Sequence, residues 1–308
     1  MKHLVLGVDI GGTNVKLGLT NSVGHILARS HFSTKTFMRD KPRLVKAIID
    51  AAGKLLTDYK LQFKNLAGIG MGWPGLVDPY KGIIKFLPNI PGWEGTPIVR
   101  IFQKELGIKT YIENDVNLIT MGEWCFGAGK GVKDLVCITL GTGVGGGLIL
   151  DNRIYRGPGY AAGEIGHMPI NEKGPACVCG GFGCFEQYVG NSVLQKKAAR
   201  LFNRPRITIE EVYALADQGD NRALKFWEET AVHIGNALTG IVNVLNPRLI
   251  VIGGGVANNE KFLFKTITAT IKKRAMKVQA SMFKIVRGKL GDDAGIIGAQ
   301  LLVLEKLY

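Results

Sequence analysis

The chain has 308 residues, 46% of them hydrophobic and 21% charged, an ordinary globular composition and enough length for two lobes that each bury a core. Lysine and arginine exceed aspartate and glutamate by 39 − 25 = 14, a surplus that can indicate nucleic acid, membrane surfaces or polyanionic substrates. The basic residues are scattered and form no arm or stripe with interleaved aromatic residues, and no window reaches membrane-spanning length. We therefore expect neither a nucleic-acid partner nor a membrane partner.

The N-terminus, MKHLVLGVDIGG, reads as a buried strand and not as a signal peptide, because it has no long apolar stretch and no small-residue cleavage site. The cysteines agree with this reading. Three of the five are clustered as in a metal site, and Cys125 and Cys137 stand alone. Such cysteines indicate a reducing compartment, so we expect a cytoplasmic protein without disulfides.

Two segments about 130 residues apart share one design. Residues 4–20 and 135–150 each read as an apolar strand, a Gly/Thr turn and a second apolar strand. This repeat, among alternating helices and strands, predicts an α/β protein with two duplicated mixed-sheet lobes and a cleft between them. The other expected elements are a helix near 44–59, strands at 66–72 and 110–112, a helix over 231–245, a strand over 248–252 and a final helix ending near 306.

We expect the lobes to divide the chain near residues 117 and 292. Residues 1–117 form a small N-terminal α/β lobe in this interpretation, and residues 118–292 form a large α/β lobe with a zinc-binding loop at 167–184. The final helix, about 293–308, is expected to pack back on the small lobe.

Three glycine-rich turns could hold phosphate, because glycine N–H groups are exposed to an anion without a Cβ in the way. The first, at Asp9–Thr13, adds a carboxylate that could orient water around Mg²⁺, and Lys16 could add a phosphate contact. The second is at 140–147, and the third, at Gly253–Val256, would let an adenine ring lie against backbone. One such turn is weak evidence, but three in this order favour a nucleotide. Neither a Walker A motif nor a dinucleotide fingerprint is present.

The stretch YIENDVN follows a strand and opens a predicted helix at residues 111–117. Either Asn114 or Asp115 could simply cap that helix. Alternatively, Asp115 is a carboxylate that takes a hydroxyl proton while a phosphoryl group moves, and Asn114 binds neighbouring sugar hydroxyls.

One histidine and three cysteines follow the spacing H-x9-C-x-C-x4-C, at His167, Cys177, Cys179 and Cys184. This is the ligand set of a closed tetrahedral zinc site, which is structural because no position remains for water. The alternative is chance clustering in a glycine-rich loop. Glu164 and Glu186 flank the ligands, and two carboxylates on a rigid loop suit the hydroxyls of a polyol.

From Val5 to its C-terminus the chain resembles the ROK family of sugar kinases and repressors, within the actin-like ATPase superfamily. The resemblance rests on the two phosphate motifs, Asn114-Asp115, Glu164–His167, the cysteine cluster with Glu186, Gly253–Val256 and Asp292–Ala299. It implies a two-lobed actin-like ATPase (ribonuclease H-like) α/β fold. It also implies ATP, Mg²⁺ and structural Zn²⁺ as cofactors, a small sugar as substrate, and a homodimer or homotetramer.

The resemblance assigns roles to matching positions. Asp115 would be the base that deprotonates the sugar hydroxyl. His167 would serve twice, with one ring nitrogen on zinc and the other on the sugar, and Cys177, Cys179 and Cys184 would complete the metal shell. The sugar-binding set would be Gly75, Asn89, Asn114, Asp115, Glu164, His167 and Glu186. The nucleotide-binding set would be Asp9, Gly11, Gly12, Thr13, Asn14, Lys16, Thr142, Gly143, Gly145, Gly254 and Gly255.

The stretch NIPGW at residues 89–93 is similar to that of family glucokinases, so we expect phosphorylation of the 6-hydroxyl of glucose. Kinases for N-acetylmannosamine, N-acetylglucosamine, fructose or allose share the motif residues and stay open. Polyphosphate stays open as a donor because of the charge surplus. A non-catalytic sugar sensor is the remaining alternative. Asp9 lies near the start of the sequence, without the preceding helix-turn-helix of family repressors, and the phosphate loops are intact, so we favour a kinase.

Overall fold

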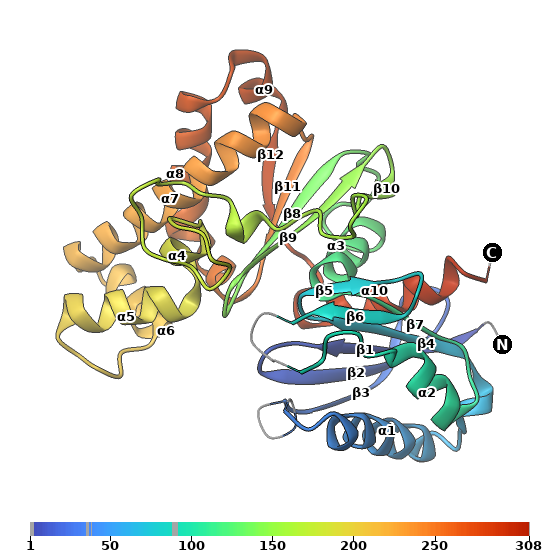
Figure 1. The fold of residues 1–308 in the computed structure, drawn as a ribbon. Coiled ribbons are helices and arrows are strands. Elements are labelled where there is room, and N and C mark those ends of the chain that lie inside the picture. The colour runs from blue at the N-terminus through green and yellow to red at the C-terminus, as the bar shows by residue number, and fades with distance from the viewer. Residues whose placement is uncertain (1–2, 35–36, 38, 88–91, 308) are drawn as a thin grey trace. The chain divides into compact units, whose positions relative to one another are not determined.

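The computed structural model describes residues 3–34, 37, 39–87 and 92–307. Residue contacts divide the chain into two compact units. Figure 1 shows the chain coloured from its N-terminus to its C-terminus. The first unit comprises Met1–Gly131, Ile154–Ala162 and Leu290–Tyr308, and the second comprises Val132–Arg153 and Gly163–Lys289. The predicted division into a lobe of residues 1–117 and a lobe of residues 118–292 stays a prediction.

The first unit contains a five-stranded mixed sheet in the order β3-β2-β1-β4-β7. Strands β1, β2 and β3 form an antiparallel meander, whereas β1, β4 and β7 run parallel. A short antiparallel pair, β5–β6, follows β4. The bounds are β1 Leu4–Ile10, β2 Asn14–Thr20, β3 Ile26–Ser33, β4 Leu66–Trp73, β5 Leu76–Asp78, β6 Ile83–Phe86 and β7 Thr110–Asn114.

Helices cover both faces of this sheet (Figure 1). One face carries large apolar side chains, such as Leu6 and Leu17, that pack in one core with α1 and α2. The other face carries glycines that let α10 approach closely. A Cβ on Gly7 would lie 2.5 Å from the carbonyl oxygen of Ile296, and one on Gly70 would lie 2.0 Å from that of Ala299. The helices of this unit are α1 Lys41–Asp58, α2 Ile98–Leu106, α3 Asp115–Cys125 and α10 Ala294–Leu304.

The second unit repeats the sheet of the first. Its strand order is β10-β9-β8-β11-β12, with β8 and β9 antiparallel and β8, β11 and β12 parallel. The predicted duplication is thus confirmed, because the two sheets share one order of neighbours and one pattern of directions. The bounds are β8 Leu135–Leu140, β9 Val144–Leu150, β10 Arg153–Ile154, β11 Leu249–Gly253 and β12 Lys284–Arg287.

The long helix α7 is central to the core of the second unit. Its buried Phe226, Trp227 and Leu238 pack with residues of β8, β11 and α8. Asp220 caps its N-terminus by accepting from the backbone N–H groups of Arg222 and Ala223, and Asn246 ends it in a left-handed conformation. The helices of this unit are α4 Glu186–Val189, α5 Asn191–Phe202, α6 Ile209–Asp217, α7 Asn221–Leu245, α8 Glu260–Arg274 and α9 Lys277–Met282.

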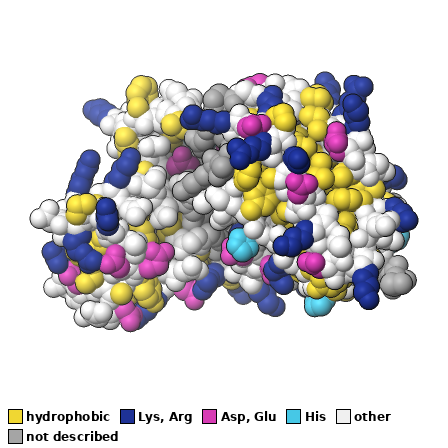
Figure 2. Space-filling view, turned by 90° about the horizontal axis from the view of Figure 1, so that it is seen from below, with side chains coloured by type: hydrophobic (Ala, Val, Ile, Leu, Met, Phe, Trp, Pro, Cys, Tyr) yellow, Lys and Arg dark blue, Asp and Glu magenta, His cyan; other side chains and the backbone are white. Residues whose placement is uncertain are grey.

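Lysine and arginine side chains are spread over the face of the molecule in Figure 2, with acidic side chains among them. This distribution agrees with the scattered charges of the sequence. Among the described residues, no helix is both long and apolar enough to cross a membrane.

Candidate functional site

The parallel strands of the first unit bring several predicted site residues to one sheet edge. Asp9 of β1 lies opposite Gly72 of β4, and Gly72 lies opposite Glu113 of β7. Asn114 and Asp115 follow directly. Because parallel strands end at the same edge, the carboxyl ends of β1, β4 and β7 form one surface, the usual place of ligands in such sheets.

The β1–β2 turn is closed by backbone hydrogen bonds. Gly11 N donates to Asn14 O at 2.9 Å, and Thr34 N donates to Thr13 O at 2.9 Å. Gly12, Thr13 and Asn14 are exposed at its tip. A Cβ on Gly12 would meet no atom within 4 Å, so this glycine leaves open space for a ligand.

Asp9 stands at the base of this turn beside two charged residues. Burial raises the pKa of Asp9 to about 6, Lys16 acts in the opposite direction, and Asp292 raises it further. Lys16 Nζ lies 2.6 Å from Asp292 Oδ1, whose side chain is 92% exposed. The predicted phosphate ligand Lys16 therefore has a carboxylate partner that a phosphate would have to displace.

Asn114 caps α3, one of the two roles between which the sequence left a choice, and sugar binding stays a prediction. Its Oδ1 accepts from Asn117 N at 3.0 Å, which caps α3, and its Nδ2 donates to Gly75 O at 3.0 Å. The predicted sugar-side residues Gly75 and Asn114 are thereby brought together. The amide keeps a second N–H for a ligand.

Asp115 is the first residue of α3 and is partly exposed. Its Oδ1 accepts from Val116 N at 2.9 Å. The helix approaches β4 closely here, because a Cβ on Gly72 would lie 3.3 Å from Asp115 Cα. A carboxylate is thus fixed at the sheet edge by backbone packing.

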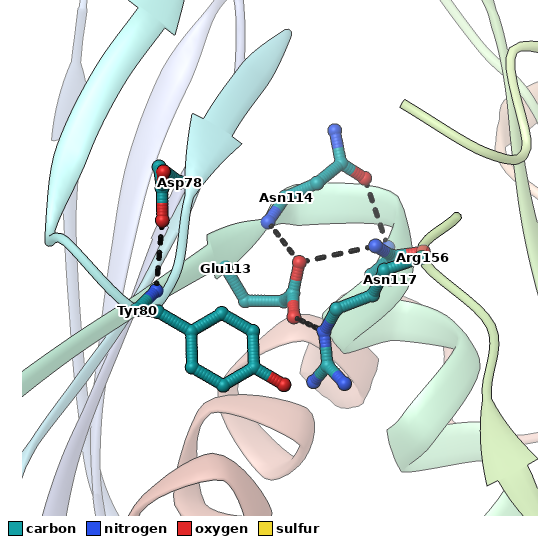
Figure 3. A network of polar contacts seen from close by, with 6 residues as sticks. All are labelled: Asp78, Tyr80, Glu113, Asn114, Asn117 and Arg156. Carbon is teal, nitrogen blue, oxygen red and sulfur yellow. Dashed lines mark hydrogen bonds and ion pairs between the residues drawn. The ribbon is translucent and has the colours of Figure 1, made fainter. Parts of the chain in front are cut away.

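Glu113 and Arg156 form an ion pair beneath these residues that the sequence analysis missed (Figure 3). Arg156 Nε donates to Glu113 Oε2 at 2.5 Å, while Asn114 N and Asn117 Nδ2 donate to Glu113 Oε1 at 2.9 and 3.0 Å. The side chain of Glu113 is only 2% exposed. A glutamate directly after a predicted apolar strand is a signal that the sequence offers, but its partner lies 43 residues away.

In the second unit, the β8–β9 turn is the counterpart of the β1–β2 turn. Gly141 N donates to Gly143 O at 2.9 Å, and Thr142 lies at the tip. Gly254 packs against the end of β8, since a Cβ there would lie 2.4 Å from Leu140 O, and its φ of +83° favours glycine. The predicted residues Thr142, Gly143, Gly145, Gly254 and Gly255 therefore share one sheet edge.

Glu186 is held against this turn. Its Oε2 accepts from Val144 N at 2.8 Å, and a Cβ on Gly143 would lie 2.3 Å from the same oxygen. A side chain at position 143 would therefore displace the carboxylate of Glu186 from its contact with the turn. Glu186 connects the predicted sugar set to the predicted phosphate turn.

The four predicted metal ligands are brought together. The ligand atoms of His167, Cys177, Cys179 and Cys184 all lie within 4.8 Å of one another. His167 Nδ1 is 3.5 Å from Cys177 Sγ, and the sulfurs of Cys179 and Cys184 are 3.6 Å apart. Tetrahedral Zn²⁺ with bonds of about 2.3 Å to sulfur needs sulfurs roughly 3.8 Å apart, so this donor set fits zinc.

The other ring nitrogen of His167 faces Glu164. Its Nε2 lies 4.0 Å from Glu164 Oε2, on the side away from the thiols. Burial raises the pKa of Glu164, His167 lowers it and Glu186 raises it. The predicted sugar-binding residues Glu164, His167 and Glu186 thus influence one another, whereas Asn89 lies outside the described residues.

Comparison with known proteins identifies the family. The model of the ROK family matches residues 5–306. The chain belongs to the ROK family. The predicted fold, a two-lobed actin-like ATPase fold with duplicated mixed sheets, is confirmed by its structural neighbours.

Both enzymes and regulators of the ROK family are similar to this chain. A glucokinase of Halalkalibacterium halodurans is 34% identical over 98% of this chain and 95% of its own length. A xylose repressor of Caldicellulosiruptor bescii is 28% identical over 98% of this chain and 78% of its own length. The crystal structure of a ROK glucokinase of Streptomyces griseus with glucose and AMPPNP has a TM-score of 0.86 at 29% identity, covering 98% of this chain and 99% of that one.

The buried ion pair predicts that the free energy of unfolding of this ROK protein depends on Arg156. We expect Arg156→Ala to lower the free energy of unfolding by about 3 kcal/mol, because it leaves a buried carboxylate with only part of its partners. Urea unfolding of both proteins measures the difference. Arg153→Ala, which removes an exposed arginine nearby, is the control, and equal stability of Arg156→Ala and wild type would contradict the prediction.

The raised pKa of Asp9 predicts that the stability of the protein depends on pH. The folded chain retains a proton on Asp9 up to a pKa of about 6, whereas the unfolded chain releases it near 3.8. The proton therefore stabilises the folded state at low pH, and this contribution is lost as pH rises towards 6. We expect Asp9→Asn to gain stability relative to wild type between pH 4 and pH 7 in urea titrations. A difference that does not change with pH would contradict this.

Proposed function

We propose that this protein is an ATP-dependent hexose kinase that phosphorylates the 6-hydroxyl of glucose. The observation that carries the proposal is the carboxylate of Asp115, fixed at the sheet edge on which the β1–β2 turn also opens. The similarity to ROK glucokinases over almost the whole chain supports the same activity.

Asp115 would accept the proton of the attacking hydroxyl. Phosphoryl transfer leaves little covalent chemistry to the protein, so position and charge carry catalysis. The remaining N–H of Asn114 would donate to a neighbouring hydroxyl while its other contacts hold α3 and the Gly75 backbone in place. The buried Glu113–Arg156 pair would keep this end of β7 rigid.

Glu164, His167 and Glu186 would bind the ring hydroxyls. Glu186 uses Oε2 for Val144 N, which leaves Oε1 to accept from a hydroxyl. His167 Nε2 and the carboxylate of Glu164 face the same space. Charged acceptors make shorter and stronger hydrogen bonds than neutral ones, so a sugar that lacks these hydroxyls would bind less well.

Mg-ATP would be the donor. The β1–β2 turn, with Gly11–Asn14, and the β8–β9 turn, with Thr142, Gly143 and Gly145, would supply N–H groups to phosphates, and Gly254 and Gly255 would lie against adenine. Asp9 in its ionised form, above pH about 6, would orient a water on Mg²⁺. Zn²⁺ held by His167 and the three cysteines would stabilise the segment that carries the sugar ligands. We also propose a cytoplasmic location and assembly as a homodimer or homotetramer.

A competition among sugars tests the proposed specificity. Glucose, mannose, fructose, allose, N-acetylglucosamine and N-acetylmannosamine are offered at equal concentration with Mg-ATP, and the products are quantified by mass spectrometry. We expect glucose 6-phosphate to dominate. If an N-acetylhexosamine or a ketose wins by more than about tenfold in kcat/KM, a difference of ~1.4 kcal/mol in transition-state binding, the glucose assignment is wrong. Replacing ATP by polyphosphate in a parallel reaction tests the donor.

The similarity to xylose repressors supports a second candidate, a sugar sensor without catalysis. Such a protein would bind its sugar but release no ADP. Coupled ADP release with each sugar separates the two functions, because turnover within the usual range of roughly 1–100 per second for kinases requires an intact catalytic site.

A further inference from the structure

A cationic cavity lies in the second unit, beside the predicted zinc-binding loop, and none of the predicted site residues lines it. It is open, has a volume of about 860 Å³, lies between α5 and α7, and extends to Pro175 and Gln187. This volume is within the range of roughly 300–1,000 Å³ that small-molecule sites occupy.

The cavity combines apolar lining residues with a surplus of positive charge. Phe226 and Leu201 are among its apolar residues. Lys196 and Arg200, one helical turn apart on α5, face it together with Lys225 of α7, and no ion pair to these three is found among the described residues.

The other charged residues of the cavity are already paired. Lys197 Nζ donates to Glu229 Oε2 at 2.8 Å and lies 5.5 Å above the ring of Phe226. Arg222 makes hydrogen bonds to Asp220 of 3.0 and 3.4 Å. Glu229 forms an ion pair with Lys197 and also attracts Lys225, so the lysines and arginines of the cavity outnumber the acids beside them and a net positive charge remains for a ligand.

A small organic phosphate matches both the basic and the apolar residues of this cavity. Arginine binds phosphate oxygens through two parallel N–H donors, and lysine adds a compact charge. The apolar lining residues provide a surface for the organic part of the ligand. The charges gather at one cavity and do not form an extended stripe, which favours a small molecule over a polymer.

Helix α4 connects this cavity to the candidate centre. Gln187 lines the cavity, and its Nε2 donates to Cys177 Sγ at 3.6 Å. The preceding residue, Glu186, accepts from Val144 N at the β8–β9 turn. A ligand that hydrogen-bonds Gln187 changes a contact to a metal ligand, and α4 has only four residues over which to relax.

We propose that this cavity is a second binding site, for a small organic phosphate, whose occupancy acts through Gln187 and α4 on the segment 167–184, the metal loop. Coupling of this kind between two sites is typically about 5–150-fold. Neither the binding nor the coupling requires the proposed kinase activity.

Calorimetry on the full chain tests the binding, with glucose and a non-hydrolysable ATP analogue present at saturation to occupy the proposed catalytic residues. The probes are glucose 6-phosphate, inorganic phosphate and tripolyphosphate. We expect one additional site per chain for glucose 6-phosphate, with a Kd at least tenfold higher in Arg200→Ala/Lys225→Ala. Lys272→Ala/Lys273→Ala, with the same charge change on exposed positions of α8, should bind as wild type does. Tightest binding of tripolyphosphate or inorganic phosphate would overturn the organic class, and equal losses in both double variants would overturn the site.

Proteolysis tests the coupling. The rate of cleavage within the metal loop is measured with and without glucose 6-phosphate. With the ligand at a concentration that calorimetry shows to saturate each protein, we expect this rate to change at least fivefold in wild type and not in Gln187→Ala. An unchanged rate in wild type, or an equal change in Gln187→Ala, would overturn the route through α4.

Discussion

Replacing Asp115 with asparagine is expected to lower kcat by about 10²–10⁴-fold, the usual cost of losing a general base. Asparagine keeps the size of the side chain, and its Oδ1 can still accept from Val116 N, so the start of α3 is preserved. What is lost is the carboxylate that, in the proposed function, takes the proton of the sugar hydroxyl. The affinity for glucose should change far less than turnover, because binding of the ground state does not require proton transfer.

Steady-state kinetics with glucose and Mg-ATP measure this effect, and equilibrium binding of glucose measures affinity separately. Asp58→Asn, which changes an exposed carboxylate at the end of α1, is the matched control and should retain wild-type kcat. Near-normal kcat in Asp115→Asn would exclude Asp115 as the base. A loss of unfolding free energy in that variant would instead indicate a structural role.

The parts of the site that are local in sequence could be predicted well. The β1–β2 and β8–β9 turns follow from strand–glycine–strand patterns within about 17 residues, and the two sheets repeat one another as the pattern indicated. The four metal ligands fall within 18 residues, and the structure brings their side chains together. Short chain separation leaves few alternative arrangements, which is why such motifs can be interpreted without a fold.

The parts that depend on distant residues could not be predicted. Glu113 finds Arg156 across 43 positions, and no local pattern marks that pair. Glycine was interpreted only in the three turns that could hold phosphate, whereas Gly7 and Gly70 make room for α10, which lies more than 220 residues further along the chain. Both features arise from packing between elements, and their signal in a single sequence is only a buried charge or a small residue.

Asn114 shows that two interpretations of one residue need not exclude each other. The sequence offered a helix cap or a ligand-binding amide as alternatives. In the structure the oxygen of the amide caps α3, and the nitrogen side reaches Gly75 with one N–H to spare. Capping fixes the amide in one orientation, which is what a binding group requires.

Loss of zinc is expected to disorder the metal loop and abolish tight sugar binding. Between His167 and Cys184 the chain has little secondary structure of its own, only the isolated bridges Pro169–Cys184 and Ala176–Phe182. A metal bound by this loop would therefore determine the position of His167. Apparent zinc affinities of structural sites, about 10–16 kcal/mol in peptides, are large enough to order such a segment. Met168 and Ile170 of the loop pack against the core that contains Phe226 and Trp227, but most of that core comes from helices and strands outside the loop, so the unit should stay folded.

We expect one zinc per chain in protein purified without added metal, and less than a tenth of that in Cys179→Ser or Cys184→Ser, by elemental analysis. Burial raises the pKa of Cys184 to about 12, so binding of zinc near neutral pH must release a proton, and zinc content should fall as the buffer is made more acidic. In the cysteine variants, limited proteolysis should cut within residues 168–185 while circular dichroism stays close to wild type, and the KM for glucose should rise. Cys125→Ser removes a cysteine outside the cluster and is the control. Less than about half an equivalent of zinc in wild type, or unchanged zinc in Cys179→Ser, would show that these four side chains do not form a zinc site.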